Sequence, residues 1–404
     1  MRFVHPAHPG RCVRLGYCMN LHVARTLDEW FDALRRVTLP LRERLHAGRE
    51  SFGVGMYLPA ALAFELVRDL RARERVIAFL EAERLDAFSY NAFPYEHFQS
   101  DELKARVYAP DWSQPERLAY TLAVAQLALN FREAREGEQI SISTHAGGFG
   151  ADLRHEPRAQ AAREGLQQAA VALDALARDH GRRIVLSLEA EPRSNANDTR
   201  DAAALVRSLG AGLSSLGLCL DACHSAVEFE DPRASARLAL TCGNFGKLQY
   251  SSALVCRTPE QNPQAYAALL AMAEPRFLHQ VTGRAGEREL AWLDLDELRQ
   301  SGPKGAEELR CHFHVPVDAE SLGPLGTTRD HARLILEELL RTPQQWGSQE
   351  LHVEIETYTW QVLPETARGA AREGAEASEG LISALEREYR AVMGELSAAG
   401  WHRA

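Results

Sequence analysis

Short apolar segments that suit β-strands alternate along the chain with amphipathic segments that suit helices, and this alternation restricts the fold most. Strands that alternate with helices pair in parallel, and eight such units predict an α/β fold, a (β/α)8 TIM barrel. A doubly wound open sheet is the alternative, less favoured because no glycine-rich phosphate loop follows the first strand. The eight strand-like runs are LGYCMNLH (15–22), FGVGMYL (52–58), AFSYNAF (87–93), QISISTHA (139–146), RIVLSLEAE (183–191), LGLCLDACH (216–224), GKLQYSSAL (246–254) and LHVEIETY (351–358).

The spacing of the runs predicts how 404 residues are divided. We expect a single domain, residues 1–404, because α/β barrels often exceed 250 residues, with a barrel core over about 13–364. The chain between the seventh and eighth runs is too long for one helix. It predicts an insertion over about 258–345 that partly covers the barrel mouth. A C-terminal helical extension is expected over about 365–404, ending in GLISALEREYRAVMGELSAAG with apolar residues at helical spacing.

Composition narrows the classes of partner. The formal net charge is −10, and an acidic chain repels phosphate backbones, which argues against nucleic acid as the main partner. The seven cysteines are scattered without paired spacing, so we interpret them as small buried residues in a reducing compartment. No secretion-signal pattern and no uninterrupted apolar stretch of membrane-spanning length is present. The expectation is a cytoplasmic protein without a membrane span.

Polar residues share one phase near the end of several strand-like runs. Successive side chains of a strand point to opposite faces, and the aliphatic set must face the helices. The polar set therefore points into the barrel near its C-terminal mouth, where barrel active sites lie. This set comprises Ser187, Glu189 and Glu191 in the fifth run, Cys219 and Asp221 in the sixth, and Glu354 and Glu356 in the eighth.

Several inward carboxylates around one axis would repel one another strongly in a pocket of low dielectric constant. A divalent cation is the simplest neutraliser, and carboxylates with few histidines suit Mn²⁺ or Mg²⁺ better than Zn²⁺, which stays the alternative. Arg193 or Lys247 could instead neutralise part of the charge. Asp221 and His224, three residues apart, could both face the cavity, or the aspartate could simply cap the next helix.

Further polar and aromatic residues fall near the same mouth. Gln249 could be a weak neutral ligand or could hydrogen-bond a substrate, and His312 or His314 could enter the site from the insertion. Each such residue, taken alone, is more often a packed polar group than a functional one. The residues predicted to contact a substrate are Asn91, Tyr95, His145, Glu191, His312, Glu354 and Trp360.

The motifs LSLEAEP, CLDACHSA, LQYSSAL and VEIETYTW resemble those of the xylose-isomerase-like TIM barrels, which include sugar isomerases and epimerases and endonuclease-IV-type repair enzymes. More narrowly, GYCMNLH, NAFPY, VYAPDWSQPERLAYT, SISTHAGG, HFHVPV and VEIETYTWQVLP are similar to the EboE-type metabolite-traffic proteins. This narrower resemblance extends from about residue 15 to residue 364.

The resemblance implies roles for individual residues. Catalytic roles are implied for Glu189, Glu356 and His224, with Glu191 competing for the position of Glu189. The strand-seven histidine of the superfamily is replaced by Gln249, so His314 could substitute as a ligand. Asn91 stands where the repair enzymes have a metal-binding histidine, although His145 matches another of their histidines. The implied metal ligands are Glu189, Asp221, Gln249, Glu356 and His314.

Three functions are compatible with these observations. The first is a metal-dependent isomerase or epimerase acting on a small polyhydroxy or carbonyl metabolite in a metabolite-traffic or biosynthetic pathway. The second is a protein that binds a metabolite without converting it and assists transport with other proteins of the pathway. The third is a phosphodiesterase of the endonuclease-IV type, which the acidic balance, Asn91 and Gln249 disfavour.

Overall fold

The computed structural model describes the whole chain except residues 46–49, 133–136, 151–155, 211, 243 and 364–374. Eight strands pair in parallel, each with the next along the chain, and β15 pairs with β2 to close the ring. The predicted (β/α)8 barrel is therefore confirmed, and the open-sheet alternative is wrong. The barrel strands are β2 (Cys12–Cys18), β3 (Phe52–Tyr57), β4 (Leu85–Asn91), β5 (Gln139–His145), β6 (Arg183–Glu189), β7 (Leu216–Asp221), β8 (Asn244–Tyr250) and β15 (Glu350–Ile355).

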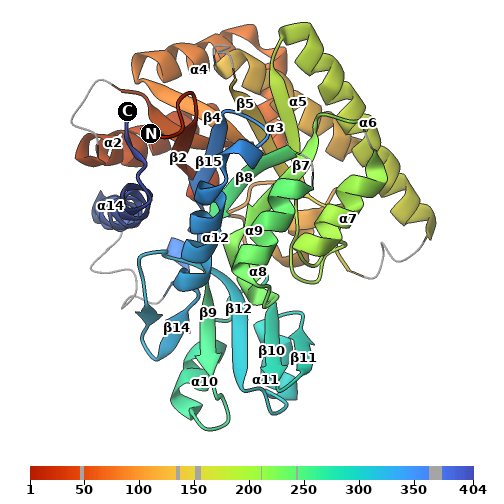
Figure 1. Cartoon of the computed structure of the whole chain (residues 1–404), viewed down its shortest axis with the longest axis vertical. Coiled ribbons are helices and arrows are strands. Elements are labelled where there is room, and N and C mark those ends of the chain that lie inside the picture. Colours follow the sequence, from red (N-terminus) through yellow and green to blue (C-terminus); the bar gives the residue numbers. More distant parts are fainter. Residues whose placement is uncertain (46–49, 133–136, 151–155, 211, 243, 364–374) are drawn as a thin grey trace.

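Helices surround this ring (Figure 1). Their buried faces carry aliphatic and aromatic residues that join the strands in one large core. In chain order they are α1 (Leu27–Ala33), α2 (Leu39–Leu45), α3 (Ala60–Arg68), α4 (Leu70–Ala82), α5 (Pro115–Phe131), α6 (Glu156–His180), α7 (Thr199–Leu209), α8 (Ala222–Val227), α9 (Pro232–Thr241), α12 (Arg329–Arg341) and α14 (Ala375–Ala398). Short strands β1 (Arg2–Val4) and β16 (His402–Arg403) pair antiparallel and bring the two termini together.

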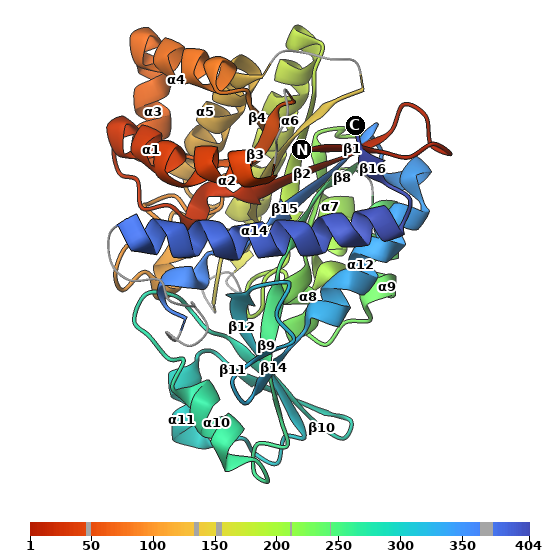
Figure 2. The same cartoon turned by 90° about the vertical axis from the view of Figure 1, so that its left-hand side faces the viewer.

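The C-terminal helix α14 lies along the side of the barrel, next to α2 (Figure 2). It packs Leu385, Tyr389 and Val392 into the main core and so fills the place of the eighth barrel helix. Its buried Glu388 accepts hydrogen bonds from the Thr357 hydroxyl, at 2.6 Å, and from the Val317 backbone N–H, at 3.2 Å. Burial raises the pKa of Glu388 to about 8. One helix thus holds both the end of β15 and the segment after β12.

The insertion between β8 and α12 forms a separate antiparallel sheet of six strands, in the order β11-β10-β12-β9-β14-β13. It begins one residue after β8 and projects from the C-terminal ends of the barrel strands (Figures 1 and 2). Residues such as Leu254, Trp292 and Phe313 form its own apolar core. Its elements are β9 (Ser252–Arg257), α10 (Pro263–Leu270), β10 (Val281–Ala285), β11 (Arg288–Trp292), α11 (Leu295–Ser301), β12 (Glu308–Val315), β13 (Ser321–Leu322) and β14 (Leu325–Thr327).

The interior of the barrel is polar at several levels. Lys247 and Glu354 form an ion pair at 3.0 Å, and both side chains are completely buried. The ammonium group of Lys247 also donates to the Tyr90 carbonyl at 3.0 Å. Ser141 and Ser187 share a hydrogen bond of 2.8 Å beside Gly246, where a Cβ would lie 1.8 Å from the Ser187 hydroxyl. These contacts show that the polar phase of the strands does face inward.

Two expectations from composition can be compared with the structure. All seven cysteines lie in the described part of the chain, and all are buried with free thiols. Among the described residues, no helix combines the length and the apolar character needed to cross a membrane.

Removal of the buried cation should destabilise the barrel strongly. We expect Lys247→Met to lower the free energy of unfolding by about 3–5 kcal/mol, because it leaves the buried Glu354 carboxylate without its partner. The double variant Lys247→Met, Glu354→Leu should recover most of this loss, since it removes both charges. Denaturant unfolding of the three proteins measures the difference; equal stability of the single and double variants would contradict the assignment.

Candidate functional site

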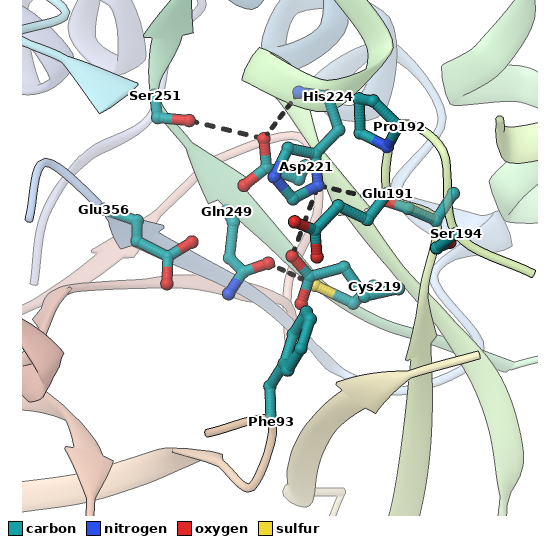
Figure 3. A network of polar contacts seen from close by, with 12 residues as sticks. Phe93, Glu191, Pro192, Ser194, Cys219, Asp221, His224, Gln249, Ser251 and Glu356 are labelled. Atoms are coloured by element: carbon teal, nitrogen blue, oxygen red, sulfur yellow. Dashed lines mark hydrogen bonds and ion pairs between the residues drawn. The ribbon is translucent and has the colours of Figure 1, made fainter. Parts of the chain in front are cut away.

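Three carboxylates converge at the C-terminal mouth of the barrel. Glu189 ends β6, Asp221 ends β7, and Glu356 directly follows β15. One oxygen from each lies within 4.8 Å of the others, and all three side chains are buried. Figure 3 shows Asp221 and Glu356 around this space, with Gln249 of the intervening strand β8 between them. Parallel strands therefore bring together residues that are 32 to 167 positions apart in the chain.

Several oxygens of this carboxylate group lack a hydrogen-bond donor. Asp221 Oδ1 accepts from the His224 backbone N–H, at 2.9 Å, and from the Ser251 hydroxyl, at 3.4 Å (Figure 3). Asp221 Oδ2 and Glu189 Oε2 are buried without a donor among the described residues. Glu356 Oε1 accepts from the Asn20 amide at 2.8 Å. Buried carboxylate oxygens without donors are costly, and a bound cation would satisfy them.

The electrostatics of the group also fit a cation. Burial, followed by the charges of Glu356 and Asp221, raises the pKa of Glu189 well above its usual 4.5. Burial, followed by the charge of Asp221, likewise raises the pKa of Glu356. The two basic residues considered as neutralisers are engaged elsewhere: Lys247 pairs with Glu354, and Arg193 pairs with Glu228 at 3.2 Å. The carboxylate group therefore offers suitable ligands for a divalent metal.

Three histidines border the carboxylates. His224 lies in the first turn of α8, whereas His312 and His314 come from β12 of the insertion. Burial lowers the pKa of His314 to about 4 and that of His312 well below its usual value. His224 and His314 each place a ring nitrogen within 4.8 Å of an Asp221 oxygen. The insertion therefore contributes side chains to the mouth of the barrel.

A cavity that is partly open to solvent lies over this group; its empty space, open solvent included, is about 510 Å³. Its inner end is polar, with Asn20, Asn91 and Glu191 beside the carboxylates and histidines. Its other walls are largely apolar and are formed by Phe93, Pro94, Phe98, Leu103, Val107, Phe277, Leu278 and Tyr358, together with the basic residues Lys104 and Arg276. The rings of Phe98, Phe277 and Tyr358 contact one another with centroids 4.7–5.1 Å apart. The cavity thus has one polar end and one aromatic wall.

The structure brings most of the predicted site residues together. Asp221 adjoins the cavity through its contact with His224. Gln249 accepts a hydrogen bond from the Cys219 thiol at 2.9 Å, so its amide oxygen is occupied by a protein donor (Figure 3). The predicted residues that line the cavity are Asn91, Glu189, Glu191, His224, His312, His314 and Glu356.

Four residues predicted to contact substrate lie outside the cavity lining. Glu354 is paired with Lys247 in the barrel interior. His145 lies behind Phe93, with the ring centroids 5.1 Å apart. Tyr95 packs edge-on against Tyr120, and Trp360 belongs to the core of the insertion. The sequence predicted all four near the mouth, but an ion pair or packing against neighbouring side chains occupies them.

Sequence reasoning missed several lining residues. Asn20 lies in the short helix η1 (Met19–Leu21) just after β2 and belongs to the GYCMNLH motif, so its position after a strand was a usable signal. Phe98, Leu103 and Phe277 come from loops far from the strand ends. No periodicity or motif marks them, because only the folded insertion places Phe277 against Phe98.

Comparison with known proteins finds similar folds. No protein-family model and no curated protein matches the chain. Among solved structures, a xylose isomerase-like TIM barrel protein from Mycobacterium smegmatis in complex with magnesium is 14% identical, covering 98% of this chain and 99% of its own, with a TM-score of 0.48. An IOLI protein with a bound zinc atom is 13% identical, covering 96% and 99%, with a TM-score of 0.49. A putative sugar phosphate isomerase/epimerase from Anabaena variabilis is 12% identical, with the same coverage and TM-score.

One of these solved structures is described as a xylose isomerase-like TIM barrel. The likeness concerns the fold, which the strand pairing of this chain establishes independently. It does not assign a reaction. The narrower resemblance to EboE-type proteins stays a prediction.

The raised carboxylate pKa values predict the pH dependence of stability. Because the folded, metal-free chain holds these protons more tightly than the unfolded chain, their contribution is present below about pH 4.5 and is lost as the pH rises through the folded values. The free energy of unfolding of the wild type should therefore fall between pH 5 and 8. In Glu189→Gln we expect this fall to be less steep, by up to about 1.4 kcal/mol per pH unit. Thermal unfolding of chelator-treated wild type and variant measures this; parallel curves would contradict it.

Proposed function

We propose that this protein is a divalent-metal-dependent enzyme of the isomerase or epimerase type, acting on a small hydroxy-carbonyl or polyhydroxy metabolite. The observation that carries the proposal is the convergence of Glu189, Asp221 and Glu356 within 4.8 Å beside a cavity. The oxygens of these three residues would hold a divalent cation, with Mn²⁺ or Mg²⁺ preferred and Zn²⁺ the alternative. The cation would supply Lewis-acid polarisation of a substrate carbonyl and its neighbouring hydroxyl.

The two glutamates are suited to move the proton. Glu189 and Glu356 reach the cavity from β6 and β15 on either side of Asp221. A carboxylate that borders the cavity can accept a proton from a bound substrate and return it. Asn20 holds the Glu356 carboxylate through a 2.8 Å hydrogen bond. One glutamate would remove the proton next to the carbonyl, and the other would return a proton.

The polar end and the apolar wall of the cavity would contact different parts of the substrate. The reacting hydroxyl and carbonyl groups would lie at the polar end, near Asn91, Glu191 and the carboxylates. The rest of the molecule would contact the apolar wall around Phe98, Phe277 and Tyr358. A substrate with a hydroxy-carbonyl end and an apolar or aromatic body would fill both parts, because apolar walls reward buried apolar surface.

We also propose that the enzyme works in a metabolite-traffic or biosynthetic pathway of the EboE type, with other proteins of that pathway as partners. The motifs that support this proposal lie in order between residues 15 and 364. Several of them are at the cavity: NAFPY contributes Asn91, Phe93 and Pro94, and HFHVPV contributes His312 and His314. A purely metabolite-binding role is the competing outcome, and the exchange experiment below separates the two.

Metal content tests the carboxylate site. We expect purified wild-type protein, grown with Mg²⁺, Mn²⁺ or Zn²⁺ in turn, to retain a divalent ion, and Asp221→Ala to lose the ion held by the carboxylates. Asp174→Ala is the matched control, since Asp174 is a buried aspartate that binds Ser214 away from the site. Elemental analysis gives the stoichiometry; a wild-type protein without metal under all three conditions rules out the proposal.

Proton exchange tests the reaction. In D₂O, wild-type protein should catalyse deuterium incorporation next to the carbonyl of at least one compound in a panel of ketoses and aryl-substituted α-hydroxy ketones, followed by NMR. Glu356→Gln should keep the fold and lower the exchange rate by about 10²-fold or more, because general acid–base groups contribute on this scale. Full exchange in this variant would exclude the proton-transfer role, and stoichiometric binding without exchange would favour a metabolite-binding protein.

A further inference from the structure

Three histidine rings meet at a single point between the barrel and the insertion. The Nε2 atoms of His224 and His312 are 3.1 Å apart, those of His224 and His314 are 3.2 Å apart, and those of His312 and His314 are 3.0 Å apart. All three side chains are 4% exposed or less, yet all three line the cavity. They come from two units: α8 of the barrel and β12 of the insertion.

The other ring nitrogen of each histidine faces an oxygen acceptor. His224 Nδ1 donates to the Ala190 carbonyl at 2.9 Å, and His314 Nδ1 donates to the Glu356 carbonyl at 2.9 Å. His312 Nδ1 lies 2.5 Å from Oε1 of Gln280. The Gln280 amide nitrogen donates to the Pro192 carbonyl, which fixes the orientation of that amide. In a ring that carries one proton, these contacts place that proton on Nδ1.

With one proton on each ring, the three Nε2 atoms direct lone pairs at one another, and the Tyr358 hydroxyl lies 3.4 Å from the Nε2 of His312. Short contacts between two such lone pairs are not hydrogen bonds, and in a buried setting they repel. Three nitrogens bound to one Zn²⁺ ion at about 2.0–2.1 Å lie roughly 2.9–3.4 Å apart, depending on the bond angles. The observed spacings of 3.0–3.2 Å fall within that range. The Nδ1 acceptors are also the outer partners that metal-bound imidazoles use to hold their orientation.

We infer that His224, His312 and His314 form a second metal site, specific for a borderline transition ion such as Zn²⁺ and distinct from the carboxylate group. Imidazole ligands suit Zn²⁺, whereas carboxylate oxygens suit Mg²⁺ and Mn²⁺. Three protein ligands would leave a coordination position open, and all three histidines line the cavity. An Asp221 oxygen lies within 4.8 Å of the His224 and His314 nitrogens and also belongs to the carboxylate group, so it connects the two sites.

This assignment gives the insertion a chemical role. Two of the three ligands belong to β12, so the histidine site exists only when the insertion is docked on the barrel. His314 also ties the insertion to the backbone of Glu356, a residue of the carboxylate group. His224 then acts as a metal ligand, in place of the catalytic role that the resemblance implies. The inference does not depend on an isomerase reaction, because it concerns only which atoms hold the ion.

Zinc binding to the full-length protein tests the site. Chelator-treated protein is titrated with Zn²⁺ and separately with Mn²⁺, and the zinc-loaded wild type is examined by X-ray absorption. We expect one tight zinc ion with three imidazole nitrogens at about 2.0–2.1 Å. His312→Gln and His314→Gln should each weaken zinc binding roughly 100-fold or more, since loss of an outer partner alone already costs 10–100-fold. Near-ultraviolet circular dichroism checks that each variant is folded.

The controls separate this site from the carboxylate site. His331→Gln removes a nearby imidazole that bonds Ser225 but is not part of the trio, and it should bind zinc as the wild type does. Glu189→Gln should keep the zinc site and lose Mn²⁺ binding. A zinc spectrum without three imidazoles, or unchanged zinc affinity in His312→Gln and His314→Gln, overturns the inference and leaves the carboxylate site untouched. If Glu189→Gln and Asp221→Ala both still bind Mn²⁺, that result counts against the proposed function alone.

Discussion

Mutual repulsion among buried carboxylates is the constraint on which the mouth of this barrel depends. Glu189, Asp221 and Glu356 point into one small space because they end or follow parallel strands with the same inward phase. Water cannot screen them there, and burial and neighbouring charges raise the pKa of both glutamates. Such an arrangement persists only if protons or a cation offset the charge. Function and stability are therefore coupled at the mouth of the barrel. The three carboxylates that lower the stability of the metal-free chain are also the residues that would bind the metal.

Glu354 of β15, the strand that Glu356 follows, is also an inward carboxylate, but its environment differs. Glu354 lies two residues before Glu356 and faces the same interior, but the Lys247 ammonium neutralises it at 3.0 Å. Glu354 is thus paired with a lysine, whereas no lysine or arginine in the described part of the chain forms an ion pair with the three carboxylates at the mouth. This difference separates a structural ion pair from a ligand group. It depends on Lys247 reaching across from β8 toward Glu354 on the neighbouring strand β15.

The insertion and the last helix complete what the strands begin. β12 delivers His312 and His314 to the mouth, and Phe277, between α10 and β10, packs against Phe98 and Tyr358 to form the aromatic wall. Glu388 of α14 accepts hydrogen bonds from the segments after β12 and after β15. The helix therefore links the insertion to the end of the last barrel strand. The cavity therefore belongs jointly to the barrel and the insertion, and movement of either would change both its metal ligands and its apolar wall.

The sequence by itself determined the alternation of strands and helices, the parallel barrel, and the inward phase that brings Glu189, Asp221 and Glu356 together. These features follow from local periodicity, which is legible along the chain because strand and helix place side chains at fixed intervals. Only the tertiary structure decided that Gln249 binds Cys219, that Glu354 is paired, and that His145 lies behind Phe93. It also decided that the Nε2 atoms of three histidines lie 3.0–3.2 Å apart, although His312 and His314 come 88 and 90 residues after His224 in the chain. Such contacts depend on how a separately folded sheet docks on the barrel, and no local pattern in the sequence records that docking.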